Sequence, residues 1–270
     1  MYRSIQIAIV ATIMASTSFF LWRISFKYSD WAVLALFPLT LILSTSFWSL
    51  TFHPRKAILS IALRDGSSWH KWFTGKIRAT FMSTAFTLGA IIILAWQALR
   101  ASPREAALML TIFFISAVSY SFLEKFLSQN VRQPFSRFLA TTPVTWCLAI
   151  PATITIATAF WHFSPIPGQM VDASFQESLK IGLSQLSSRE GWISKSLSVF
   201  SGYEAAKLWV AMQLRDYKAI GWLFSLDKAL FSIILCQTSI VVTQFVEAHI
   251  LPLHKLKPSL EGSVNDADPM

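Results

Sequence analysis

The sequence predicts an all-α integral membrane protein with about six transmembrane helices, amphipathic interfacial helices and a helical external segment. Hydrophobic residues make up 54% of the 270 residues, and the mean hydropathy is +0.51. Charged residues make up only 14%, well below the roughly 25% of soluble domains. A soluble chain needs more charge than this to solvate its surface, so we expect most of the surface to face lipid.

Uncharged runs long enough to cross a bilayer supply the second observation, because a helix needs about 20 residues to span the hydrocarbon core. The runs cover residues 4–22, 31–52, 79–99, 106–123, 142–161 and 229–246. We interpret the first run as an uncleaved helix rather than a signal peptide. No small-x-small cleavage pattern follows it, and Trp22 and Arg23 do.

Basic residues in the short loops set the expected orientation. With the N-terminus in the cytoplasm, the cytoplasmic loops and tail hold more basic residues than the short external loops, which hold Arg23, Lys27, Arg100 and Arg104. We therefore expect both termini to be cytoplasmic, an arrangement that suits a bacterial inner membrane.

Tryptophans near the helix ends support this layout, because indoles prefer the interface between hydrocarbon and headgroups. Those expected at external ends are Trp22, Trp31, Trp96 and Trp161, and those at or near internal ends are Trp48, Trp72 and Trp146.

Four parts follow along the chain. Residues 1–163 hold the first five transmembrane helices and their basic inner loops. Residues 164–228 form an external amphipathic helical segment, residues 229–250 the sixth transmembrane helix, and residues 251–270 a polar cytoplasmic tail that we expect to be disordered.

The inner loop over residues 53–80 is basic and carries two tryptophans. We expect residues 54–64 to form a short interfacial helix, and residues 69–80 to form a basic, aromatic elbow that lies against anionic headgroups. The loop could also dock a cytoplasmic partner. The candidate partner-binding residues of the inner face are Trp69, Lys71, Trp72, Lys76 and Arg78. No nucleic-acid-binding motif accompanies the charge, so nucleic acid is not an expected partner.

The external segment is expected to contain three short amphipathic helices. Two capping-box patterns, which begin at Ser187 and Ser201, separate them. The last helix is expected to run on into the sixth transmembrane helix. The apolar faces of these helices either lie on the bundle or on lipid, or they bind another protein. For the second alternative, the candidate partner-binding residues of the outer face are Phe175, Leu179, Trp192 and Trp209.

Catalytic motifs are missing from the sequence: it has no P-loop, no Rossmann glycine pattern, no G-x-S-x-G and no CxxC. We therefore expect neither enzymatic activity nor a cofactor. His53, Glu247, His249 and His254 could gather at the inner surface, but no two of the histidines have the i, i+4 spacing of a zinc motif, so no metal site is expected.

Ionisable residues fall at the ends of the uncharged runs, as Glu124, His162, Glu247 and His249 do. Because ion-coupled transporters usually keep such groups within the membrane, this position argues against ion coupling. Gln237 and Gln244 lie seven residues apart, on one helix face. These candidate intramembrane polar residues either bond to another helix or line a polar path.

These features favour an integral membrane subunit or scaffold of a larger envelope complex, which acts through protein partners without catalysis of its own. The expected partners are the lipid bilayer and other membrane or envelope proteins, or a second copy of this chain. The alternative is a small permease or channel whose path is lined by Ser, Thr and Gln.

Overall fold

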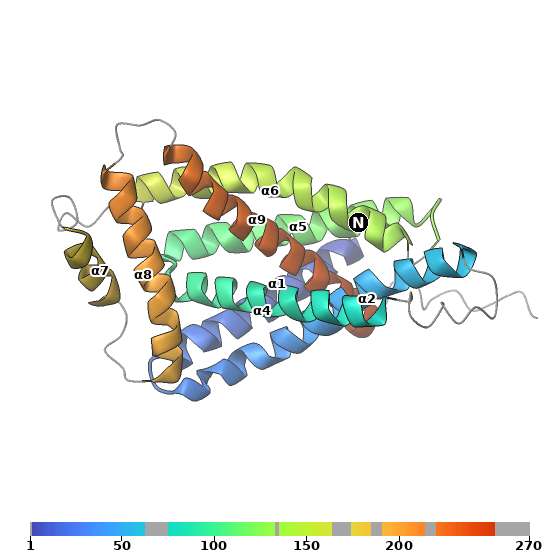
Figure 1. Ribbon diagram of the computed structural model, residues 1–270. Helices are drawn as coiled ribbons and strands as arrows, with labels where there is room; N and C mark the ends of the chain where they lie inside the picture. Colours follow the sequence, from blue (N-terminus) through green and yellow to red (C-terminus); the bar gives the residue numbers. More distant parts are fainter. Residues whose placement is uncertain are drawn as a thin grey trace, which may run out of the picture.

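The computed structural model describes residues 2–62, 75–132, 135–163, 174–184, 191–213 and 220–251. Within these ranges the chain forms helices and turns and no strand (Figure 1). Six helices are long and apolar enough to cross a membrane. The predicted fold class, an all-α membrane protein, is therefore confirmed.

The helices follow one another along the chain with short connections. They are α1 (Tyr2–Ser25), the 3₁₀ helix η1 (Asp30–Leu36), α2 (Phe37–Ala62), α4 (Lys76–Arg100), α5 (Pro103–Leu127), α6 (Phe135–Phe163), α7 (Phe175–Ser184), α8 (Trp192–Gln213), α9 (Ile220–Phe245) and the π-helical turn η3 (Val246–Ile250).

The bundle is built around α9, which packs against α1, α2, α4, α5 and α6. In the membrane-spanning part of α9, 72% of the residues are buried, against 28–39% in the other spans. Its sequence explains this position, because a helix that is apolar on all sides is suited to a core. The small polar residues Ser232, Thr238, Ser239 and Thr243 are buried on it, and such residues let helices approach closely in lipid.

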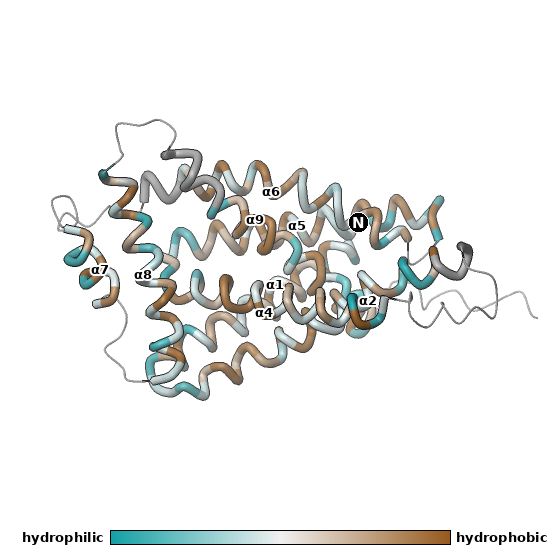
Figure 2. The backbone as a smooth tube through the Cα atoms, in the orientation of Figure 1, coloured by the Kyte–Doolittle hydropathy of each residue, from teal (hydrophilic) through white to brown (hydrophobic). Residues whose placement is uncertain are grey.

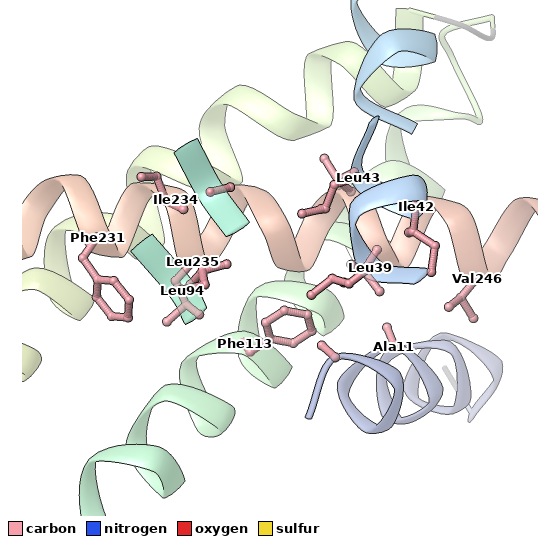
Figure 3. Close-up of a cluster of buried hydrophobic side chains, with 14 of the residues drawn as sticks. Ala11, Leu39, Ile42, Leu43, Leu94, Phe113, Phe231, Ile234, Leu235 and Val246 are labelled. Carbon is pink, nitrogen blue, oxygen red and sulfur yellow. The ribbon is translucent and has the colours of Figure 1, made fainter. Parts of the chain in front are cut away.

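Two ends of the bundle are distinguished below. The terminal end is where α1 begins and η3 ends, and the α8 end is where α8 crosses the other helices (Figure 1). The long helices of the bundle carry most of the apolar surface, and α7 and α8 are more polar (Figure 2). Between the two ends, the main core brings together Leu39, Leu43, Leu94, Phe113 and Leu235 (Figure 3).

The apolar face of α8 packs onto the bundle. Ile193 and Leu197 belong to one buried cluster with Trp22 and Trp96, and the indole Nε1 of Trp22 donates to the Ala95 carbonyl (3.1 Å). Trp22 and Trp96 are therefore buried under α8, and the prediction that they anchor in the lipid interface is wrong for both. Trp31 is exposed, as an interfacial anchor requires.

Two helices are longer than the sequence predicts. The chain from Phe37 to Ala62 is one helix with Pro54 inside it, so no separate interfacial helix begins at residue 54. Membrane helices tolerate an internal proline because neighbouring groups take up the freed carbonyl. The second is α8, which runs through the predicted break at Ser201. The hydroxyl of Ser201 donates to the Gly182 carbonyl of α7 (2.5 Å) and does not cap a helix.

Candidate functional site: a polar cavity beside a buried charged cluster

A cavity of about 750 Å³ lies among α2, α4, α6 and α9, in the half of the bundle toward the terminal end. This volume falls in the usual range of small-molecule sites, roughly 300–1,000 Å³. Hydroxyl side chains of α2 and α4 form much of its wall: Ser44, Thr45, Ser46, Ser49, Thr80, Ser83 and Thr84. The cavity is therefore a polar space inside a bundle that is otherwise apolar.

Helical spacing places these hydroxyls on shared faces. On α4, Thr80, Ser83 and Thr84 follow an i, i+3, i+4 pattern, which brings them to one side of the helix. The Ser83 hydroxyl donates to the Ser44 carbonyl (2.6 Å) and joins the two walls. The Trp48 indole Nε1 donates to the Thr80 hydroxyl (3.3 Å). Serine and threonine are weak helix formers, so such a run indicates a role other than helix formation.

Several of the hydroxyls are already used as donors. Thr45 donates to the Leu41 carbonyl (2.8 Å) and Thr80 to the Lys76 carbonyl (2.9 Å). Within the described part of the chain, the hydroxyls of Ser46, Ser49 and Thr84 make no hydrogen bond. These three side chains can donate to a molecule in the cavity.

A charged cluster adjoins the cavity. Arg137, in the first turn of α6, lines the cavity, and its Nε lies 3.9 Å from Oε1 of Glu124 on α5. Glu124 is 1% exposed and Glu247, in the π-helical turn η3, is 2% exposed. Glu247 interacts electrostatically with both Glu124 and Arg137. Two carboxylates and one guanidinium thus share one buried site.

A hydrogen bond links this cluster to the central helix. Nε2 of Gln244 donates to the Tyr120 hydroxyl oxygen (3.0 Å), and it lies 3.5 Å from the Thr141 hydroxyl oxygen. Gln244 also lines the cavity. Arg137 and Gln244 therefore belong both to the cavity wall and to the buried cluster.

The helix geometry explains how three helices contribute to one cluster. Tyr120 and Glu124 are four residues apart on α5, and Gln244 and Glu247 are three apart at the end of α9, so each pair lies on one face. The helices α5, α6 and α9 all pack against one another. The turn that carries Glu247 is closed by a π-type bond from Leu251 N–H to the Val246 carbonyl (2.8 Å), and π turns occur frequently at functional sites.

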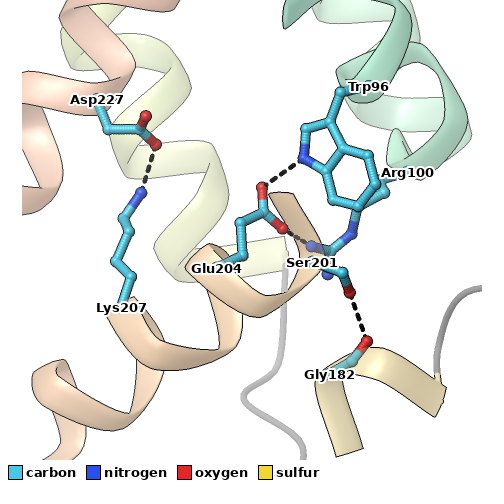
Figure 4. Close-up of polar contacts among 7 residues, drawn as sticks. All are labelled: Trp96, Arg100, Gly182, Ser201, Glu204, Lys207 and Asp227. Carbon is cyan, nitrogen blue, oxygen red and sulfur yellow. Dashed lines mark hydrogen bonds and ion pairs between the residues drawn. The ribbon is translucent and has the colours of Figure 1, made fainter. Parts of the chain in front are cut away.

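The α8 end also carries charged side chains, but each has close partners. Glu204 on α8 accepts a hydrogen bond from the indole Nε1 of Trp96 (3.0 Å) and pairs with Arg100, both on α4 (Figure 4). Lys207 pairs with Asp227 at the start of α9. These contacts hold α8 across the bundle, so we assign them a structural role.

The residues singled out from the sequence fall in different places. Lys76 and Arg78 begin α4 and are exposed, whereas Trp69, Lys71 and Trp72 lie outside the described residues. The rings of Phe175 and Trp209 contact each other (centroids 5.3 Å apart).

The other predicted residues are as scattered. Leu179 is half-buried and lies against Gly202 of α8, and Trp192 is exposed. Gln237 is half-buried, and Gln244 alone of the predicted residues lies at the cavity.

The sequence interpretation missed Glu124, Glu247 and Arg137. It placed the two glutamates at helix ends and took this as evidence against ion coupling. They do lie near the ends of their helices, but they are buried between helices, so that argument is wrong. The signal that could have found them is the pairing of Tyr120 with Glu124 and of Gln244 with Glu247 on single helix faces.

Among the described residues, no group of three His, Cys, Asp or Glu side chains is arranged to hold a metal ion. No family model, curated protein or solved structure matches the chain.

Proposed function

We propose that the protein is a small permease that binds a polar solute in the cavity at the terminal end and carries it across the membrane. The observation that carries this proposal is a polar cavity of about 750 Å³ whose wall includes Arg137 and Gln244 of the buried cluster. Burying ionisable groups within a membrane protein costs free energy, and such groups usually mark a substrate or ion pathway.

A purely structural bundle would not require these features. Apolar or small side chains pack membrane helices without the desolvation cost of two carboxylates and a guanidinium. The cost is concentrated at one site, beside a cavity, and this placement favours solute binding.

The route beyond the cavity is closed by the apolar core around Leu39, Leu43 and Phe113. Transport therefore requires the helices to rearrange and open the cavity toward the α8 end. Pro143 and Pro151 interrupt the hydrogen-bond ladder of α6, and the π turn interrupts that of α9. Such interruptions are the usual positions at which helices bend.

The proposed setting is a bacterial inner membrane with the terminal end in the cytoplasm, in agreement with the basic short loops. Cysteines introduced at the exposed positions Ser196 on α8 and Lys125 on α5 test it. We expect the cysteine at Ser196 to react with an impermeant reagent from outside the cell, and that at Lys125 only after permeabilisation. The reverse pattern would refute the orientation.

Water access to the cavity tests the proposed function without knowledge of the solute. In a background in which Cys147 is replaced by serine, we expect Ser49→Cys to react with a small charged thiol reagent in proteoliposomes. Thr155→Cys, on the exposed surface of α6, should not react. An unreactive Ser49→Cys in folded protein would exclude a solute-filled cavity and with it the permease.

A positive result leads to a direct transport assay. Proteoliposomes are loaded with labelled polar solutes, and flux is compared between the natural protein and Thr84→Val, with Thr155→Val as the lipid-facing control. We expect the cavity variant to lose flux and the control to retain it.

The second candidate function is a subunit of an envelope complex. It is favoured by Trp192, Val199 and Tyr203, which are exposed on α8 at spacings of seven and four residues and so share one face. A tagged purification in mild detergent tests it. A stoichiometric partner that is retained by the natural protein and lost from Val199→Asp would support the subunit function over the permease.

A further inference from the structure

The charges of the cavity wall point to the class of solute. Among the described residues that line the cavity, none is Asp or Glu, whereas Arg137, His53 and His249 are present. The unbonded hydroxyls of Ser46, Ser49 and Thr84 add donors. A guanidinium with nearby hydroxyl donors is suited to the oxygen atoms of an anion, because it offers several N–H groups in a fixed plane.

Arg137 is only loosely held by Glu124. The 3.9 Å between Nε and Oε1 exceeds hydrogen-bond length, and within the described residues neither atom has a hydrogen-bond partner. The guanidinium therefore lies between the carboxylate and the cavity, without the paired N–H···O bonds that would fix it to the carboxylate.

The surrounding charges make this arrangement sensitive to an incoming anion. Glu124 on α5 interacts with Arg137 from α6, and Glu247 from η3 interacts with both. Tyr120 lies on the same helix as Glu124 and interacts with all three. The remaining helix packed against α5 is α1, which brings Arg3 to the terminal end of the bundle.

We propose that the cavity binds a small anion at Arg137 and that the Glu124–Glu247 pair takes up a proton when the anion binds. This inference rests on the proposed solute-binding role of the cavity. The anion draws the guanidinium away from Glu124 and leaves two carboxylates in a buried site without their counter-charge. Such a state is strongly unfavourable. One carboxylate accepts a proton from water to give a carboxylic acid, and no other bond is formed or broken.

Charge balance then makes the coupling functional. A monovalent anion and a proton together add no net charge to the membrane interior, whereas the anion alone would add one. Because the proton belongs to a coupled pair of carboxylates, it is assigned to the pair and not to one residue. The protein is thus inferred to move the anion together with a proton.

The test uses the full chain in liposomes that contain a pH-sensitive dye. Nitrate and benzenesulfonate serve as anionic probes because neither titrates near neutral pH, and urea serves as the neutral probe. An inward gradient of either anion at equal pH should acidify the interior. If one proton is bound per anion, the apparent Kd in detergent should rise about tenfold per pH unit above the titration of the pair.

Three variants separate the parts of the inference. Arg137→Gln should weaken anion binding by about 30-fold or more, the usual consequence of losing a buried charged partner, and Arg132→Gln, an exposed arginine five residues earlier, should not. Arg137→Lys keeps the charge without the planar donor set, and we expect about tenfold weaker binding. This variant decides the matter if Arg137→Gln does not fold. The double variant Glu124→Gln, Glu247→Gln should bind anions with a Kd that changes less than about twofold with pH.

The outcomes distinguish this inference from the proposed function. Anion flux without acidification in the natural protein would overturn the proton coupling. Urea flux with no anion binding that depends on Arg137 would overturn the anion class and leave the permease standing. If Ser49→Cys is unreactive and neither nitrate, benzenesulfonate nor urea moves, both proposals fail.

Discussion

Replacement of Gly182 by alanine tests how α7 is held on α8. The hydroxyl of Ser201 donates to the Gly182 carbonyl (2.5 Å), and Gly182 and Ser178 are buried in the contact. An added Cβ would overlap the Cβ of Ala205 and lie 3.3 Å from the Ser201 carbonyl oxygen. Both obstacles are fixed, one being backbone and the other a methyl group that cannot rotate away, so the two helices must separate.

The size of the effect follows from opposing contributions. Overpacking of a close contact costs about 1–3 kcal/mol, and weakening of the Ser201 hydrogen bond costs about 1 kcal/mol more. Alanine regains about 1 kcal/mol of helix propensity over glycine. We expect docking of α7 on α8 to weaken by about 1–3 kcal/mol, the sum of these contributions, while the bundle itself remains folded.

Hydrogen exchange of the α7 amides measures this effect, and two other glycines provide matched controls. A Cβ at Gly202 would meet Leu179 at 3.9 Å, an ordinary contact, and one at Gly89 would meet nothing within 4 Å. Alanine at either position should leave α7 protection unchanged or raise it. If Gly182→Ala protects α7 as well as Gly202→Ala does, the close approach of the two helices is not what holds α7.

Three further predictions concern polar contacts. Gln244→Leu should cost about 1–2 kcal/mol in a denaturation experiment, because it removes the donor to the buried Tyr120 oxygen, whereas Gln237→Leu should cost less; equal losses would contradict the assignment. Glu204→Gln keeps an acceptor for Trp96 but removes the charge opposite Arg100, and since the pair is partly exposed the loss should be only about 1 kcal/mol; α8 exchange reports it. The backbone N–H and hydroxyl of Ser174 donate to Glu177 and lower the pKa of that carboxyl. Its contribution to α7 is therefore complete above the unfolded-state pKa and lost as pH falls through the folded one, and in Ser174→Ala an NMR titration should find the pKa of Glu177 raised.

The sequence was sufficient to predict the bundle because lipid imposes a simple requirement. A helix that crosses the membrane needs a long uncharged run, and each of the six runs became a span. The same argument does not locate helix boundaries. Pro54 and the Ser201–Glu204 pattern are local signals for a break, yet α2 and α8 continue through both, because contacts from other helices use the same groups.

The candidate site was harder to predict because it depends on which faces meet. A hydrophobicity profile locates Glu124 and Glu247 near helix ends, where they could equally reach solvent or headgroups. Only the packing of α5, α6 and α9 decides that both side chains turn inward beside Arg137. Gln244 was identified from its position on α9, because a glutamine amide within a span needs a partner wherever the helix faces.

The two charged clusters contain the same side-chain types and differ in how completely they are satisfied. At the α8 end, Glu204 accepts from an indole and pairs with an arginine, so its charge is fixed in place. At the terminal end, Oε1 of Glu124 has no hydrogen bond among the described residues, and its arginine also lines the cavity. A saturated carboxylate stabilises its anionic form, whereas one that depends on a single mobile counter-charge responds when that charge moves. This difference is why we assign the α8 end to assembly and the terminal end to solute and proton binding.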